Sequence, residues 1–191
     1  MRDVALIAAL LFFPPLASAQ VPPSPEILAR IGGVKLWDDE GNLGTGVSVS
    51  GGAGVRLPHG VGVEAVFERH ENHRHFDSGV KFDSAAIGIV GRLAKYFGTS
   101  RARPYAGGGL GVTRIKTMSE FPDQCGLANN NQFQCLGTRT GGRTTTSPTV
   151  SGFAGLRIAV ARSAFVRPEF EVSRLGEHLR IGGAVAAGLR W

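Results

Sequence analysis

The chain has 191 residues, 28 of them glycine, and carries a formal net charge of +6 at pH 7. This length suits a single domain. The glycines fall inside alternating apolar segments without a Gly-X-Y period, which excludes collagen and argues against disorder. Beyond the N-terminal segment, no stretch reaches the roughly 20 apolar residues that a transmembrane helix needs, so we expect no helical membrane anchor.

The N-terminus has the parts of a secretory signal peptide. Arg2 precedes an apolar run at 4–13, and Ala17-Ser18-Ala19 provides a small-residue cleavage site. The mature protein is therefore expected to be exported, with cleavage near Ala19-Gln20. The predicted division of the chain is a signal peptide at 1–19, a Pro-rich lead at 20–25 and one folded domain at 26–191.

Eight later segments alternate between apolar and polar or small side chains, which is the period of a β-strand. In the last segment Val185, Leu189 and Trp191 share one face, while Arg180 and Arg190 lie on the other. A soluble protein rarely ends on an exposed apolar strand, so we expect this strand to pair with the first one and close a barrel. The predicted strands are 26–37, 47–57, 61–68, 84–93, 104–112, 150–160, 165–174 and 180–191.

The segments average roughly ten residues, which is enough to cross an outer membrane at a tilt. Polar connections at 71–83 and at 115–148, the longest predicted irregular stretch, alternate with short turns, except that the connection through Tyr96 to Arg103 is longer. Aromatic residues cluster near strand ends, which predicts two interfacial girdles. The girdle on the turn side would hold Tyr96, Phe97, Tyr105, Phe165 and Trp191, and the girdle on the loop side Trp37, Phe67 and Phe82.

These patterns predict an all-β fold, an eight-stranded antiparallel transmembrane β-barrel with up-and-down meander topology. A soluble lipocalin-like barrel is the alternative, but it would place the apolar face inside and would not end on Trp191. The residues predicted to face lipid include Val47, Val49, Ile87, Ile89, Leu110, Leu156, Ile158, Val185 and Leu189.

The signal peptide, the Gly-rich strand that starts at Pro104-Tyr105, the Arg167-Pro168-Glu169-Phe170 strand and the terminal Trp191 resemble the small eight-stranded outer-membrane β-barrel proteins of the OmpA/OmpX-like, porin-like type. The resemblance implies a place in the outer membrane of a Gram-negative-type bacterium, with lipid and lipopolysaccharide as partners. It also implies that the barrel-assembly machinery reads a C-terminal signal made of Val185, Ala187, Leu189 and Trp191.

The second face of the strands is rich in charge, including Arg30, Glu68, Arg180 and Arg190. An eight-stranded barrel is just wide enough for side chains to fill it, and charges in so narrow a lumen must pair. We expect Glu169 and Glu171 to pair with Arg157 and Arg167, and Glu64 to pair with Arg56 or Arg92. A narrow porin is the alternative interpretation. The predicted lumen network is Arg56, Glu64, Arg92, Arg157, Arg167, Glu169 and Glu171.

On four strands the lipid-facing alternation meets a basic residue at the loop-side end. Lys and Arg at a membrane interface cost little and can hold lipopolysaccharide phosphates. The alternative is that these residues only begin solvated loops. The candidate lipopolysaccharide contacts are Lys35, Arg69, Arg114 and Arg174.

The long third loop contains Cys125 and Cys135, the only cysteines of the chain. In an exported protein the two are expected to form a local disulfide, although two free thiols remain open. We expect this loop to be the variable element that binds an extracellular ligand. Its basic residues Arg139 and Arg143 are candidates for an anionic surface or for simple solvation.

Two chemical sites are weaker candidates. His70, His73 and His75 could bind a transition metal from a flexible loop, although such histidines usually stay solvated. Ser173, Glu177 and His178 are the nearest set to a nucleophile with its base and carboxylate.

The expected function is a structural or surface-interaction role through lipopolysaccharide contact and adhesion by the extracellular loops. A lipid-modifying enzyme of the outer membrane and a narrow porin are the alternatives. We expect no catalytic residues, cofactor, bound metal or nucleic-acid partner.

Overall fold

The computed structural model describes residues 23–38, 41–75, 81–121, 124–127, 133–136 and 139–191. The predicted signal peptide at 1–19 lies outside these residues. Within them, no helix has the length and apolar character to cross a membrane.

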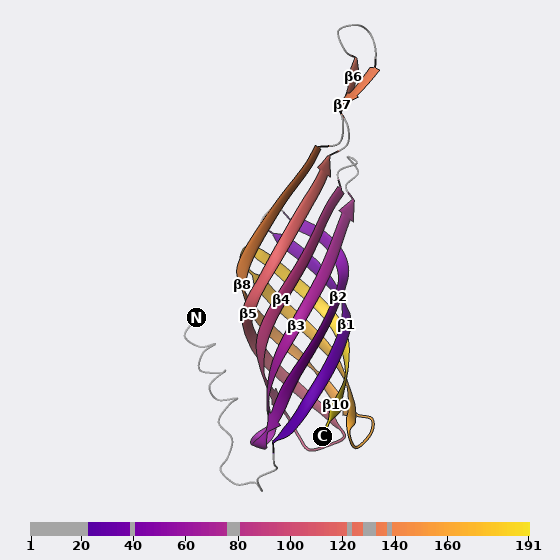
Figure 1. Cartoon of the computed structure of the whole chain (residues 1–191). Helices are drawn as coiled ribbons and strands as arrows, with labels where there is room; N and C mark the ends of the chain where they lie inside the picture. The colour runs from indigo at the N-terminus through magenta and orange to yellow at the C-terminus, as the bar shows by residue number, and fades with distance from the viewer. Residues whose placement is uncertain (1–22, 39–40, 76–80, 122–123, 128–132, 137–138) are drawn as a thin grey trace.

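Eight antiparallel strands form one closed barrel in meander order, which confirms the predicted fold class (Figure 1). The first strand pairs with the last over twelve register positions, from Glu26 opposite Arg190 to Trp37 opposite Leu179. The barrel strands are β1 (Ser24–Asp38), β2 (Gly41–Leu57), β3 (Val61–His75), β4 (Lys81–Tyr96), β5 (Ala102–Phe121), β8 (Arg139–Ala159), β9 (Ala164–Leu175) and β10 (His178–Arg190), with a 3-10 turn η1 (Pro58–Gly60) between β2 and β3.

The strands are tilted, as closure of a barrel requires. Following register partners once around the barrel from Ile27 leads back to β1 at Trp37, ten residues further along (37 − 27). This stagger brings residues that are distant in sequence to the same level of the lumen. It therefore decides which charges meet inside.

The two faces of the strands have opposite environments. On β4, Ile89 is 64% exposed and the next residue, Val90, is 3% exposed; on β5, Leu110 is 70% exposed. The predicted lipid-facing residues all lie on the outer face, although Leu156 and Ile158 are half-buried there. The apolar side chains thus cover the outside and the charged ones fill the inside. This distribution is the one expected of a membrane barrel and the reverse of a soluble lipocalin-like barrel.

Glycines on the inner face make room for aromatic rings. A Cβ built on Gly107 would lie 2.6 Å from the ring of Phe153, and a Cβ built on Gly188 would lie 2.3 Å from the ring of Phe165. Many of the glycines therefore mark places where the lumen is too crowded for a side chain.

Several boundaries differ from the predictions. β2 starts at Gly41 rather than at 47, and β3 and β4 extend to His75 and from Lys81 into the polar connection predicted at 71–83. The barrel starts at Ser24, so part of the predicted Pro-rich lead is strand. β5 continues to Phe121 and β8 begins at Arg139, so most of the segment at 115–148 is not irregular. The Thr-rich start of β8 suits an extended strand because threonine is β-branched, and β5 supplies a partner up to the Phe121–Arg139 pair.

Between these strands lies a two-stranded sheet made of β6 (Gln124–Leu127) and β7 (Phe133–Leu136). Its register places Cys125 opposite Cys135. Opposite residues of an antiparallel pair have Cα atoms about 4.5–5.5 Å apart, within the range that a disulfide spans. The cysteine side chains lie outside the described part, so the disulfide stays a prediction that the register supports.

The predicted aromatic girdles are partly wrong. Trp191 is 68% exposed and Phe97 37% exposed on the outside, but Tyr96, Tyr105 and Phe165 are buried inside the barrel. Their strand positions share the parity of the lumen charges, which the clustering at strand ends does not reveal. On the loop side, Phe82 lines the open mouth of the lumen rather than facing lipid.

Candidate functional site

Strand β9 places three charged residues in a row on the lumen face. Arg167, Glu169 and Glu171 alternate with outward side chains, so all three point inward. Arg167 bonds Glu64 on β3, and its Nη2 atom lies 3.2 Å from Oε2 of Glu169. Arg92 on β4 donates from Nη2 to Oε1 of Glu169 at 2.6 Å. One carboxylate thus joins arginines from different sides of the lumen.

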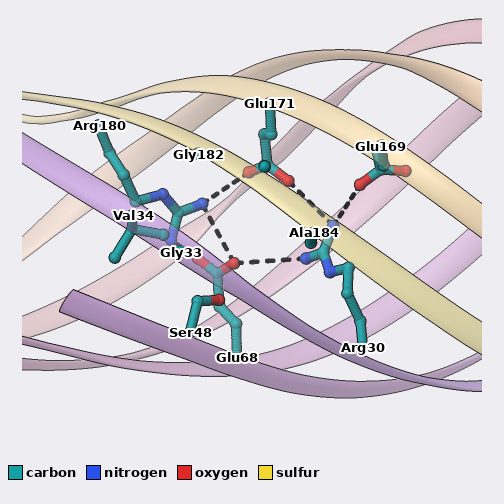
Figure 2. A pocket seen from close by; sticks show the side chains of 11 residues that line it. Arg30, Gly33, Val34, Ser48, Glu68, Glu169, Glu171, Arg180, Gly182 and Ala184 are labelled. Atoms are coloured by element: carbon teal, nitrogen blue, oxygen red, sulfur yellow. Dashed lines mark hydrogen bonds and ion pairs between the residues drawn. The ribbon is translucent and has the colours of Figure 1, made fainter. Parts of the chain in front are cut away.

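Above this level a second group of charges lies around a cavity of about 20 Å³ (Figure 2). Arg180 donates to Glu68 at 2.8 Å and to Glu171 at 2.6 Å. Arg30 reaches Glu171 at 3.1 Å and also bonds Glu169. The cavity has room for about one water molecule. We call these two groups together the central network: Arg30, Arg92, Arg167 and Arg180 with Glu64, Glu68, Glu169 and Glu171.

The pairing differs in part from the predicted one. Arg157 bonds Glu26 at 2.8 Å, so its predicted pairing with Glu169 or Glu171 is wrong. Arg56 lies 3.8 Å from the same Glu26 and does not pair with Glu64, which contacts Arg92 at 3.7 Å instead. The reason is the stagger of the barrel, which brings Arg56 on β2 and Arg157 on β8 to the level of Glu26 on β1.

Four participants were missing from the predicted network. The sequence pattern puts Arg30, Glu68 and Arg180 on polar strand faces, but the predicted network does not include them or Glu26. Glu26 shares the strand parity of Arg30, and that parity is the sequence signal that would have identified it.

Aromatic rings complete the lumen. The guanidinium carbons of Arg92 and Arg157 lie 3.6 Å and 3.9 Å from the ring centroids of Phe153 and Phe165. Tyr105 lies under Arg167 at 4.7 Å. A guanidinium group donates hydrogen bonds only within its plane, so an aromatic ring can stack on the flat face of the group. These contacts explain why aromatic residues lie inside the barrel.

An apolar layer covers the central network on the side toward the projecting ends of β5 and β8. Leu36 and Leu175 are fully buried and pack with Ala86 and Ile115. Above them the lumen opens into a mouth of about 530 Å³ that is lined partly by Phe82. The described residues therefore fill the lumen between its two ends, and this filling does not favour the narrow porin.

Of the four predicted lipopolysaccharide contacts, Arg69 on β3 and Arg114 on β5 lie on the outer surface on either side of Ile87 on β4. Both are register partners of Ile87, which is 48% exposed. Arg69 bonds the neighbouring Glu71. The pair thus sits where the apolar belt ends.

Lys35 and Arg174 occupy the same end on the opposite part of the barrel. Nζ of Lys35 lies 4.9 Å from the ring centroid of Trp37, and the register partner of both Trp37 and Arg174 is Leu179. Leu179 is 41% exposed, so these cations also border the apolar belt. We call the four residues the cationic rim: Lys35, Arg69, Arg114 and Arg174.

The three histidines, a weak candidate for a metal site, do not lie together in a loop. His70 is 1% exposed in the lumen and lies 3.3 Å from Arg180, whereas His73 is on the outer face and bonds Asp83 at 2.7 Å. The side chain of His75 lies outside the described part. The segment is strand rather than loop, so successive odd and even positions face opposite sides, and the described residues contain no metal-binding group of three.

The weak catalytic set does not come together either. The hydroxyl of Ser173 is buried, donates to Glu171 at 2.7 Å and accepts from Arg180 at 3.0 Å. His178 and Glu177 instead line the open mouth with Arg143. The side chain of Arg139 lies outside the described part. Among the described contacts, Ser173 therefore has charged partners and no histidine to activate it.

At the level of sequence, no family model and no curated protein matches the chain. The fold is shared with solved structures. Ail, the attachment invasion locus protein of Yersinia pestis, solved with the heparin analogue sucrose octasulfate, is 15% identical over 90% of this chain and 100% of that one, with a TM-score of 0.57. Neisserial surface protein A (NspA) is 19% identical over 89% and 98%, with a TM-score of 0.57. The chain thus has the fold of the small eight-stranded outer-membrane β-barrel proteins.

Proposed function

We propose that the protein is a surface-interaction barrel that is anchored in the outer leaflet by lipopolysaccharide. The observation that carries the proposal is the cationic rim, in which four basic residues lie on the outer face where the apolar belt ends. Lys and Arg at this level cost little free energy, because the penalty for a lipid-facing charge falls to about 0–1 kcal/mol near the interface. Such groups bind phosphate through charge-assisted hydrogen bonds.

The rim is tested by replacing Lys35, Arg69, Arg114 and Arg174 with glutamine. We expect the variant to fold, since exposed ion pairs such as Arg69–Glu71 contribute at most about 1 kcal/mol. It should lose the preference of the wild-type barrel for vesicles that contain lipopolysaccharide over phospholipid vesicles, measured by co-sedimentation.

A charge-matched comparison isolates the position of the charges. The double variant Arg69→Gln/Arg114→Gln should weaken the preference, whereas Arg101→Gln/Arg162→Gln, at the opposite end of the barrel, should leave it unchanged. If the quadruple variant keeps the wild-type preference for vesicles that contain lipopolysaccharide, the residues of the cationic rim only begin solvated loops.

The projecting sheet, formed by the ends of β5 and β8 beyond the other barrel strands, is the element that we propose for contact with extracellular partners. β5 and β8 pair up to Phe121 and Arg139, but the pairing of β8 with β9 starts only at Thr149 (Figure 1). In the described residues, β8 therefore has one strand neighbour over 139–147. An open strand edge can add an extended segment of a partner. Joining Lys116 to Thr144, which are register partners, would remove the larger part of this open edge. The shortened barrel should bind an extracellular partner less well and should keep its preference for vesicles that contain lipopolysaccharide.

The C-terminal strand supports a role in assembly. Trp191 is 68% exposed, and its backbone N–H donates to the carbonyl of Pro25. Trp191→Ala should therefore leave the midpoint of urea unfolding nearly unchanged but reduce the amount of protein in the outer membrane. Phe97→Ala, an exposed aromatic at the same end, is the control. Normal membrane levels of Trp191→Ala would contradict an assembly signal that includes Val185, Ala187 and Leu189.

A further inference from the structure

The end of the lumen with the short connections carries an excess of positive charge. This is the periplasmic end in barrels of this kind. Arg103 is the register partner of Arg157, and Arg190 is the register partner of Glu26, so each pair shares the lumen face. Arg56 lies across from Ser24 on the same face. We call this group the periplasmic cluster: Glu26, Arg56, Arg103, Arg157 and Arg190.

One carboxylate serves two buried guanidinium groups in this cluster. Oε1 of Glu26 lies 2.8 Å from Nη2 of Arg157 and 3.8 Å from Nε of Arg56. The side chain of Arg157 is 4% exposed and that of Arg56 is 12% exposed. Nε of Arg157 and Nη1 of Arg56 are buried and have no hydrogen-bond partner among the described residues. Buried charged donors without acceptors are costly.

The remaining two arginines add charge without neutralising it. Arg103 donates to the carbonyls of Ser100 and Thr99, and Arg190 donates to the carbonyl of Arg162. These acceptors carry no formal charge. Arg103 and Arg190 are near enough to Arg56 to repel its guanidinium, and Arg190 also repels that of Arg157. The described side chains of the cluster thus set four cations against one anion.

The central network shows that this imbalance belongs to one end of the lumen. It contains four arginines and four glutamates, and each of its arginines has at least one carboxylate within 3.2 Å. The same chain therefore balances its buried charges in the middle of the barrel and leaves them unbalanced at the periplasmic mouth.

We propose that the periplasmic cluster binds a tetrahedral oxyanion of the phosphate type. Guanidinium groups match phosphate oxygens in geometry and form charge-assisted hydrogen bonds with them. An anion held by Arg56 and Arg157 would supply the acceptors that these groups lack. Arg103 and Arg190 would contact the same anion from the periplasmic mouth. The source is either the headgroup phosphate of an inner-leaflet phospholipid or phosphate dissolved in the periplasm.

The test uses the full folded barrel in a non-ionic detergent that contains no phosphate. The midpoint of urea unfolding is measured against inorganic phosphate, with chloride at the same ionic strength as the reference. Phosphate should raise the wild-type midpoint above that in chloride. A hydrogen bond to a charged group contributes about 1.5–3 kcal/mol, so Arg56→Gln should weaken phosphate binding by about tenfold or more.

Arg162→Gln, which removes one exposed arginine outside the cluster, should keep the wild-type response. Arg103→Gln, at the periplasmic mouth, provides a second variant if Arg56→Gln does not fold. It should also reduce the stabilisation by phosphate. Equal wild-type midpoints in phosphate and chloride would overturn the proposal. So would a wild-type phosphate response in whichever of the two cluster variants folds.

Reconstitution distinguishes the two sources. If the ligand is a lipid headgroup, the response to added phosphate should disappear in phospholipid bilayers and return in bilayers of uncharged glycolipid. If the ligand is dissolved phosphate, the response should persist in both. Both outcomes support the oxyanion site, and neither depends on the lipopolysaccharide contacts at the other end of the barrel.

Discussion

Replacing Glu169 with alanine is expected to lower the free energy of unfolding by about 3–5 kcal/mol, the usual cost of breaking a buried ion pair from one side. Glu169 forms ion pairs with Arg30, Arg92 and Arg167, and its Oε2 atom accepts a hydrogen bond from the hydroxyl of Tyr105 at 2.7 Å. Without this carboxylate, three buried guanidinium groups lose a negatively charged partner. The measurement is urea unfolding of the barrel in lipid vesicles.

Glu71→Ala is the matched control for Glu169→Ala. Glu71 pairs with Arg69, but both side chains are largely exposed, at 45% and 57%. Exposed pairs contribute at most about 1 kcal/mol, so this variant should unfold close to the wild-type midpoint. If Glu169→Ala is as stable as Glu71→Ala, the central network does not hold the barrel together.

Placing an arginine on the lipid-facing side should destabilise the barrel in proportion to its depth. Leu110 is 70% exposed on β5, and its register partners are Gly91 and Val150 within the apolar belt. Leu110→Arg is expected to cost about 2–4 kcal/mol, because a cation at the bilayer midplane loses its hydration. Unfolding of the variant in vesicles measures this cost.

The same strand provides the control. Met118 has the same outward parity as Leu110 but lies beyond Arg114 of the cationic rim, and it is 41% exposed. Met118→Arg should therefore cost about 0–1 kcal/mol, as expected near or above the interface. Equal costs at the two positions would mean that the belt around Leu110 is not in lipid.

Period-2 alternation was sufficient to predict the strand faces. It placed Arg167, Glu169 and Glu171 inside and Leu110 outside because a strand has only two sides. The alternation also marked Arg180 as inward, although no partner could be named for it. Strand order followed from the need to close an apolar edge.

The partners inside the lumen could not be read from the sequence. Arg157 pairs with Glu26, which is 131 residues away, because the stagger of the barrel brings β8 and β1 to one level. The alternation pattern contains no information on that stagger. The same holds for Tyr105, whose ring is polar at one end and apolar at the other and therefore fits both an interfacial girdle and a charged lumen.

Strand ends were the least predictable feature. Lys116 and Thr144 are register partners in a polar extension of β5 and β8, where both faces meet water and the apolar alternation is lost. Polar two-sided strands give no pattern that separates them from loops. The apolar alternation therefore ends near Val112, although β5 continues to Phe121.

If the apolar face of the strands lies in lipid and the charged face lines a closed lumen, the two faces should respond differently to a probe in the bilayer. Methyl-group NMR of the wild-type barrel in bilayers, with a nitroxide-labelled lipid as the paramagnetic probe, measures this difference. Signals of Ile89, Leu110 and Val185 should be strongly broadened, and those of Val66 and Val90, which are 1% and 3% exposed, should be spared. Equal broadening on both faces, or broadening of the outward methyl groups by a water-soluble probe instead, would contradict the account.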